Sequence, residues 1–377
     1  MSAPSNFGAL GPGAISIVAE IADDRICSVR VASSRPTNLP RLFIGRPAQE
    51  IPILAERLYS LCGLSHAVAA TRAIAAARGE APAPQCGSLG VGLLCERVSE
   101  SLRSSATTAA NGGAASALDA SALRPLREIL SLTRELATLA MAPAASTAAS
   151  RAAFTHLIAR IRAAVGELGL DGPDASPRKG SWFGDLWKEM GRGPSLAVDV
   201  PDALADEDDA AILDGLRQAG EGFAAAPRLA GRTPETGAFA RHWRDVDFSA
   251  GALPARLQAR MVDLSLSLER LSRAGAGEAD ESGARSAAPA PREGFAAVQT
   301  SRGDLYHWAR LSPDGRISHY AIVAPTEWNF HPAGPFVAAL LGARVPRGAA
   351  LQSIARLAGL FDPCVVFRVD VPEAARA

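Results

Sequence analysis

The 377-residue chain has no apolar run long enough to span a membrane. Its opening residues, Met1 to Asn6, contain neither the basic region nor the apolar region of a secretory signal. Lys and Arg together number 39, as do Asp and Glu, so no charge excess favours nucleic acid or an anionic membrane. We therefore expect a cytoplasmic protein with neither nucleic acid nor membrane as its main partner.

Aromatic residues are scarce, at 5%, whereas the hydrophobic fraction of 48%, to which Ala contributes more than any other residue, suits a soluble globular protein. The five cysteines, at positions 27, 62, 86, 95 and 364, are odd in number and widely separated. Such usage argues against a disulfide framework and favours a reducing compartment. Cys27 lies in phase with Val29 and Val31 of an alternating segment, so we expect it to be a small buried residue.

Hydrophobic periodicity predicts both strands and helices. Alternation over residues 14–21 and 26–32 predicts a β-hairpin, and a Ser-Pro-Asp-Gly turn predicts a second one over 305–311 and 316–323. Helical spacing predicts five helices, over residues 93–108, 123–139, 154–168, 253–274 and 347–357. Composition predicts flexible segments over residues 104–122 and 275–292.

The stretch from Glu56 to His66 places an Arg, a thiol and an imidazole around a helix break. A helix with Leu at helical spacing ends at Gly63, and Ser65 is a good N-cap for the Ala-rich helix that follows. Cys62 would then lie just outside a helix N-terminus. The helix dipole and Arg57 would favour its thiolate, and we expect His66 to hydrogen-bond the sulfur.

This stretch resembles the proximal cysteine motif of nickel-iron hydrogenase large subunits, Arg-x-Cys-Gly-x-Cys-x-x-x-His. Arg57, Cys62 and His66 fall in register, whereas Tyr59 replaces the first cysteine and Ser60 the glycine. A register that puts Cys62 on the first cysteine loses both the Arg and the His. The family's earlier Arg-Gly-x-Glu motif, expected near residues 37–40, is missing.

The carboxyl end carries three further resemblances to the same family. Residues 301–308 are similar to Pro-Arg-Gly-x-x-x-His with Ser301 at the proline, and residues 325–329 match Pro-Thr-x-Trp-Asn. Of the motif Asp-Pro-Cys-x-x-Cys-x-x-His, only the first three residues remain, ending at Cys364. The resemblance covers roughly residues 14–100 and 228–370.

The resemblance implies an α+β fold with a mainly helical body and peripheral antiparallel hairpins. We expect one domain over residues 1–377. Its N-terminal part, 14–100, contains the first hairpin and the proximal motif. A helical region, 101–297, follows, and 298–377 contains the second hairpin and the C-terminal cysteine.

The resemblance also implies a metal site with half of the usual ligands. Nickel in these enzymes takes four thiolates, two of them shared with iron, and this chain offers only Cys62 and Cys364 at matching places. We therefore expect no stable nickel site. Iron already carrying carbon monoxide and cyanide needs fewer protein ligands, so two sulfurs could hold it. Arg302 would face the cyanides, where a planar donor fork suits a small anion. His66 and Arg57 complete the predicted cofactor-binding residues.

The function implied is a non-catalytic assembly factor for nickel-iron hydrogenase, whose partners are the large subunit or its maturation proteins. The hypothesis is a scaffold that holds the iron before its transfer. Two alternatives remain open: a degenerate structural subunit of a hydrogenase or a complex-I-like assembly, and a working hydrogenase with unusual ligands.

Overall fold

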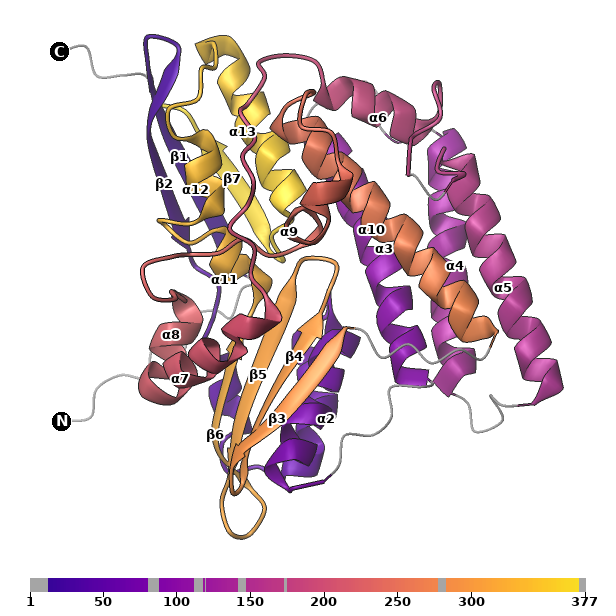
Figure 1. Ribbon diagram of the computed structural model, residues 1–377, viewed down its shortest axis with the longest axis vertical. Helices are drawn as coiled ribbons and strands as arrows, with labels where there is room; N and C mark the ends of the chain where they lie inside the picture. Colours follow the sequence, from indigo (N-terminus) through magenta and orange to yellow (C-terminus); the bar gives the residue numbers. More distant parts are fainter. Residues whose placement is uncertain are drawn as a thin grey trace.

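The computed structural model describes residues 13–80, 88–111, 118, 120–141, 147–172, 175–276 and 283–372. Long helices gather on one side of the molecule, and two small sheets with short helices form the other (Figure 1). The predicted α+β class, with a helical body and antiparallel hairpins, is confirmed. In the described part of the chain no helix is long and apolar enough to cross a membrane.

The first sheet joins segments from opposite ends of the sequence. Strand β1 (Ala14–Ala22) pairs antiparallel with β2 (Arg25–Ser33), as the alternation predicts, and its other edge pairs in parallel with β7 (Val366–Asp370). A register shift after Glu20 interrupts the alternation of the hairpin. Cys27 lies at this irregularity and is exposed, so its predicted burial was wrong.

The second sheet is antiparallel and contains β3 (Ala284–Ala290), β4 (Glu293–Gln299), β5 (Asp304–Leu311) and β6 (Ile317–Val323) in that order. The hairpin β5–β6 is the one predicted from the turn. Strand β3 lies inside the segment predicted to be flexible, so that prediction was wrong for residues 284–290, whereas residues 277–282 lie outside the described chain.

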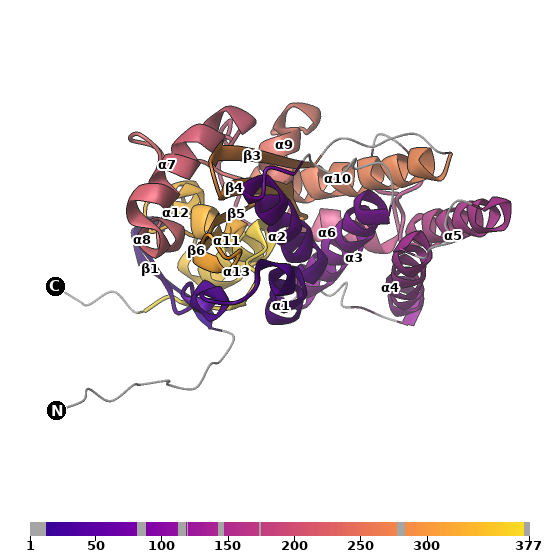
Figure 2. The same cartoon turned by 90° about the horizontal axis from the view of Figure 1, so that it is seen from below.

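Helices cover both faces of this second sheet. Helix α2 (Gly63–Ala77) packs on one face, and α7 (Asp209–Ala219) and α8 (Glu221–Ala225) contribute to the apolar cluster on the other. Gly294 of β4 makes the approach of α2 possible, because a Cβ there would lie 1.8 Å from the Ala73 carbonyl oxygen. Seen from below, α2 lies between the sheet and the helical body (Figure 2).

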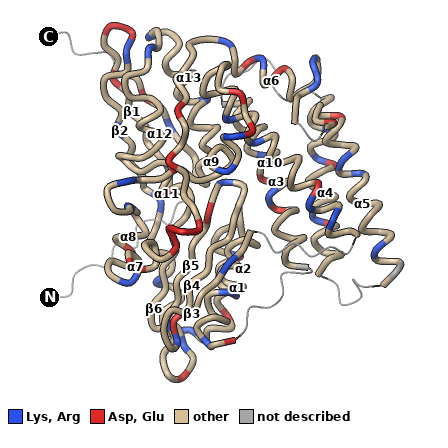
Figure 3. The backbone as a smooth tube through the Cα atoms, viewed as in Figure 1, with Lys and Arg blue, Asp and Glu red and all other residues tan. Residues whose placement is uncertain are grey.

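The helical body is built from α3 (Ser88–Asn111), α4 (Ala120–Met141), α5 (Ala148–Glu167) and α10 (Ala252–Gly275), with the shorter α6 (Trp182–Met190) against α10. Helices α4 and α5 pack on each other, as their periodicity predicts. Helix α3 continues to residue 111, so the first part of the predicted soft segment is helical, and residues 112–117 and 119 lie outside the described chain. Charges of both signs are mixed over these helices (Figure 3).

A buried ionic cluster ties α10 to α3 and to α9 (Ala238–His242). Its centre is the fully buried carboxylate of Asp263, which accepts hydrogen bonds from three cationic or imidazole side chains, those of Arg97, Arg241 and His242. The remaining short elements connect these layers. They are η1 (Leu39–Phe43), η2 (Ala48–Glu50), α1 (Ile51–Leu58), η3 (Asp206–Asp208), η4 (Trp243–Asp245), α11 (Pro325–Asn329), α12 (Pro335–Leu340) and α13 (Arg347–Phe361).

Candidate functional site

The two predicted ligand cysteines occupy helix ends. Cys62 is the N-cap of α2, which begins at Gly63, two residues before the predicted cap at Ser65. Cys364 follows α13, whose C-cap, Asp362, has a left-handed backbone with φ 53° that turns the chain toward β7. The Thr326 hydroxyl of α11 donates to the Cys364 sulfur at 3.2 Å and accepts from the Cys364 amide at the same distance. Cys364 is therefore held by α11 as well as by its own turn.

The two thiols share one electrostatic environment. Burial raises the pKa of Cys62 above its ordinary value, Arg302 opposes this shift, and the charges of Glu96 and Cys364 add to it. A charge perturbs a pKa appreciably only over a short distance in a protein interior. The folded chain therefore brings both sulfurs near Arg302, and the side chains around these three residues are called the thiol pocket below. Both cysteine residues are half-buried.

The expectation that the helix dipole would favour the Cys62 thiolate was wrong. Glu96 of α3 occupies the N-terminus of α2, where its carboxylate accepts from the Leu64 amide at 2.8 Å and from the Ser65 amide at 3.1 Å. These are the free amides that would otherwise stabilise a thiolate. Burial raises the pKa of Glu96 to about 7, against the opposing hydrogen bonds from Ser65 and Leu64.

Arg302 is 5% exposed and reaches two carboxylates. Its Nη2 donates to Glu100 Oε2 at 2.9 Å, and its Nε lies 3.3 Å from Asp362 Oδ2. Burial works against its charge, but Asp362, Cys62, Glu100 and Cys364 together raise the pKa of Arg302. Its Nη1 is buried and has no hydrogen-bond partner among the described residues. A buried donor of this kind needs an acceptor, and a small anion beside the thiols would supply one.

Arg57 does not join this pocket. The residue is exposed on α1, and the arginines that act on the Cys62 thiol are Arg302 and Arg35. Arg35 follows β2 and forms a part-buried ion pair with Glu327 of α11. Burial opposes its charge, whereas Cys364 and Glu327 raise the pKa of Arg35. Sequence reasoning missed this arginine, although it directly precedes the segment where the family's first motif was expected.

His66 is 1% exposed and lies one helical turn after Cys62. Its Nδ1 is 3.0 Å from Nε2 of His307, so the hydrogen bond found for His66 runs to β5 and not to the Cys62 sulfur. Its ring stacks on Tyr59 with centroids 3.8 Å apart and planes 10° apart. Burial raises the pKa of Tyr59, Arg35 lowers it, and both thiols raise it, so this phenol also belongs to the pocket wall.

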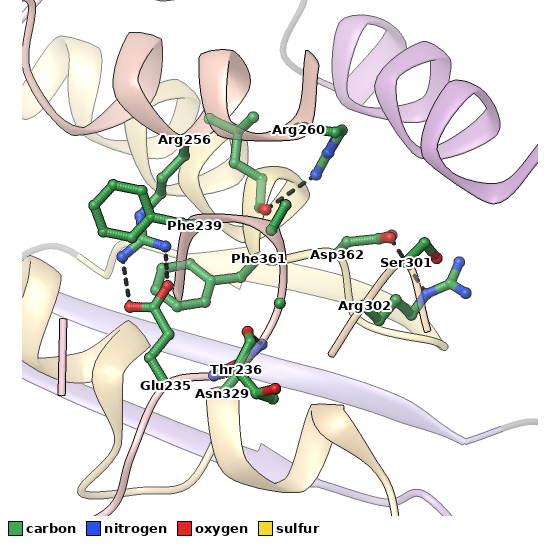
Figure 4. Close-up of a pocket in the computed structure, with 13 residues that line it drawn as sticks. Glu235, Thr236, Phe239, Arg256, Arg260, Ser301, Arg302, Asn329, Phe361 and Asp362 are labelled. Carbon is green, nitrogen blue, oxygen red and sulfur yellow. Dashed lines mark hydrogen bonds and ion pairs between the residues drawn. The ribbon is translucent and has the colours of Figure 1, made fainter. Parts of the chain in front are cut away.

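A cavity of about 20 Å³ adjoins Arg302 and Asp362 on the side of α10. Figure 4 shows the Arg302–Asp362 ion pair at one edge and the Arg256–Glu235 pair at the other. Arg260 closes the cavity by donating to the carbonyls of Gly359 and Leu360, each at 3.0 Å. The space suffices for about one water-sized group.

The ligand set around the thiols is small. Over the residues that the structure describes, no three His, Cys, Asp or Glu side chains come close enough together to hold a metal ion. Cys95 is buried and lies in the apolar core with the leucines of α3, and Cys86 lies outside the described residues. The pocket thus offers two sulfurs, one unsatisfied arginine N–H and a wall of mixed charge.

Comparisons with known proteins connect this geometry to hydrogenases. A family model described as nickel-dependent hydrogenase matches residues 256–369, which include Arg302 and Cys364. Uptake hydrogenase large subunits match over a part of the chain: that of Rhodobacter capsulatus is 35% identical over 92 residues, 23% of this chain and 15% of that protein, and that of Azotobacter chroococcum is 37% identical over 89 residues, 22% of this chain and 15% of that protein. The [NiFeSe]-hydrogenase of Desulfomicrobium baculatum has the same fold, with a TM-score of 0.66 over 91% of this chain and 94% of that chain, at 15% identity.

Two hydrogenase expression/formation proteins match this chain over nearly its whole length. The hydrogenase expression/formation protein HupK of Rhizobium leguminosarum bv. viciae is 39% identical, covering 98% of this chain and 99% of that protein. HupK of Bradyrhizobium diazoefficiens is 35% identical, covering 91% and 92%. The chain belongs to this family of hydrogenase expression/formation proteins, which is built on the fold of the nickel-iron hydrogenase large subunit.

Proposed function

We propose that this protein is a non-catalytic maturation factor for nickel-iron hydrogenase, and that its cargo is an iron ion carrying carbon monoxide and cyanide. The maturation role is supported by the relatives that match it end to end, whose names describe hydrogenase expression or formation. The cargo is our inference from the pocket. Cys62 and Cys364 would be its protein ligands, and the cytoplasm, which keeps thiols reduced, is the compartment that suits them.

The proposal depends on one observation: Cys62 and Cys364 both raise the pKa of a buried arginine, Arg302, which has an unsatisfied N–H. Thiolate sulfur suits iron, and a cyanide nitrogen would accept the hydrogen bond that Arg302 Nη1 lacks. Diatomic ligands fill most of the coordination sphere of such an iron, so two sulfurs complete it. Nickel, which brings no ligands of its own, would find too few donors here.

The same pocket suits release of its cargo. Closed sites with four protein ligands hold a metal permanently, whereas a site with few protein ligands releases it more readily. Both cysteine residues are also half-buried, so a partner protein could reach the pocket. The hydrogenase large subunit or one of its other maturation proteins is the partner that this role requires.

The test is infrared spectroscopy of the full chain purified without oxygen from cells that express a nickel-iron hydrogenase. We expect bands from bound carbon monoxide and cyanide in the wild type, and their loss in both Cys62→Ser and Cys364→Ser. Cys27→Ser is the matched control, because it removes an exposed thiol that is not a predicted ligand and should keep the bands. A wild type without bands, or bands that survive both ligand substitutions, would rule out this cargo.

The alternative of a structural subunit makes a different prediction. A subunit would co-purify at equal stoichiometry with a small iron–sulfur subunit and remain bound after the hydrogenase matures. An assembly factor dissociates from the finished enzyme, so size-exclusion chromatography of the mature complex separates the two roles.

A further inference from the structure

Three buried polar side chains form a continuous hydrogen-bonded chain behind the thiol pocket. His66 Nδ1 lies 3.0 Å from His307 Nε2, and His307 Nδ1 lies 2.8 Å from the hydroxyl of Tyr320. The three residues come from α2, β5 and β6 and are 1%, 0% and 5% exposed. The chain therefore links the helix that begins at Cys62 to the interior of the second sheet.

Both histidines of this chain are neutral. Burial lowers the pKa of His307 to about 3. Burial, followed by the neighbouring His307 and Arg35, lowers the pKa of His66 well below its ordinary value. A neutral imidazole has one N–H donor and one nitrogen that only accepts. Each hydrogen bond of the chain consequently has one donor, and all donors must point the same way along it.

The hydroxyl of Tyr320 determines the direction in which the donors of the chain point. Among the described residues its only hydrogen-bond partner is His307 Nδ1. If His307 donated, the buried O–H of Tyr320 would be left without an acceptor, and an unsatisfied buried donor disfavours that arrangement by roughly tenfold or more. If Tyr320 donates, its hydroxyl and both nitrogens of His307 are satisfied, and only the Nε2–H of His66 has no partner among the described residues; under the proposed function, a sulfur or an anionic ligand beside Cys62 would accept it. His307 then carries its proton on Nε2 and donates to Nδ1 of His66.

We propose that Tyr320, acting through His307, fixes His66 in the tautomer with its proton on Nε2. Tyr320 and His307 are thus positioning residues, and His66 is a permanent, uncharged hydrogen-bond donor. Neither nitrogen of His66 is free to bind metal, because Nδ1 accepts a hydrogen bond and Nε2 carries the proton. The role of this donor in the pocket rests on the proposed function, whereas the tautomer itself does not.

The donor has a defined use beside the thiols. The His66 ring stacks on Tyr59, whose phenol is perturbed by both Cys62 and Cys364, so the imidazole forms part of the wall of the same pocket. An N–H there stabilises a thiolate or an anionic ligand without adding a charge. Fixing the proton on Nε2 also prevents His66 from becoming a third metal ligand, which would slow release.

The tautomer can be read directly by ¹⁵N NMR of the full chain labelled at its six histidines. At pH 7 we expect His66 and His307 to be neutral, with at least nine-tenths of each protonated on Nε2. Tyr320→Phe removes the hydroxyl that sets the direction, and we expect a mixture of both tautomers at His66. Tyr306→Phe is the matched control, since it removes a buried hydroxyl of the same sheet that contacts Arg285 and neither histidine.

Three results would overturn the proposal: a cationic His66, a His66 protonated on Nδ1, or a Tyr320→Phe variant whose His66 stays as biased as in the control. The wild-type spectrum alone tests the tautomer if Tyr320→Phe does not fold. Because these spectra need no metal, they remain informative when the infrared bands are absent. A failed cargo proposal and a failed tautomer proposal are therefore distinguishable.

Discussion

Replacing Gly294 by Ala should separate α2 from the second sheet. A Cβ at this position would lie 1.8 Å from the carbonyl oxygen of Ala73 and 2.6 Å from the amide nitrogen of Ala77. Both atoms belong to the backbone of α2, so no side-chain rotation relieves the clash. The helix would have to move by well over an ångström before the contact becomes an ordinary one.

The expected loss of stability in Gly294→Ala follows from the clash between the added Cβ and the backbone of α2. Overpacking a well-packed interior typically costs about 1–3 kcal/mol. We expect about 3 kcal/mol for Gly294→Ala, because the strand and the helix backbone are both fixed by their own hydrogen bonds. The assay is urea unfolding followed by circular dichroism, with the shift in midpoint converted through the m-value. Since Cys62 and His66 are carried by α2, any bound diatomic ligands should report the same displacement in the infrared.

Gly348→Ala is the matched control for this substitution. Gly348 lies in the first turn of α13, and a Cβ there would meet no heavy atom within 4 Å. The change should leave stability unaltered or raise it by up to about 1 kcal/mol, because Ala restricts the unfolded chain. The packing argument fails if Gly294→Ala unfolds within about 0.5 kcal/mol of the wild type, the usual scatter for a harmless substitution.

Two further predictions concern buried charge. Asp263→Ala should cost about 3–5 kcal/mol, because it leaves buried cationic partners uncompensated, whereas Asp245→Ala removes an exposed carboxylate and should cost less than about 1 kcal/mol; equal costs in urea unfolding would contradict the role of the cluster. Glu96 has a folded-state pKa of about 7, raised from 4.5, so the native state binds its proton more tightly than the unfolded chain. The free energy of unfolding should therefore fall by about 3 kcal/mol as the pH rises from 4.5 to about 7. Glu96→Gln, which keeps an acceptor for the α2 amides, should lack this contribution; parallel pH profiles for the two proteins would refute the assignment.

Local patterns in the sequence predicted much of this fold. Alternating residues specified the β1–β2 and β5–β6 hairpins, and helical spacing specified α4, α5 and α10, because each pattern reflects burial of one face of a single element. The predicted burial of Cys27 was wrong because a register shift interrupts the two-residue alternation there, and nothing in the sequence pattern indicates that shift. Strand β3 was missed for a related reason. Its small residues are typical of a linker, and its strand conformation depends on pairing with β4.

The residues of the candidate site were also predicted only in part. Motifs pointed to Cys62, Cys364, Arg302 and His66; the fold places both thiols where they act on the pKa of Arg302, and His66 one helical turn after Cys62. The motif also pointed to Arg57, but Arg35 supplies the second cation. What sequence could not supply were contacts between distant elements, such as Glu96 reaching from α3 to the N-terminus of α2. Burial of the Cys62 thiol, to which the charge of Glu96 adds, raises its pKa where a lowered one was expected.

The parallel pairing of β1 with β7 sets an order of events during synthesis. The ribosome delivers the hairpin and Cys62 early, while Cys364 and the strand beside it emerge only after some three hundred further residues. Until β7 pairs with β1, the β1–β2 hairpin has an unpaired edge and Cys62 lacks the second thiol. If Cys62 and Cys364 hold the proposed cargo together, loading has to follow translation of nearly the whole polypeptide, and metal binding would depend on the completion of folding.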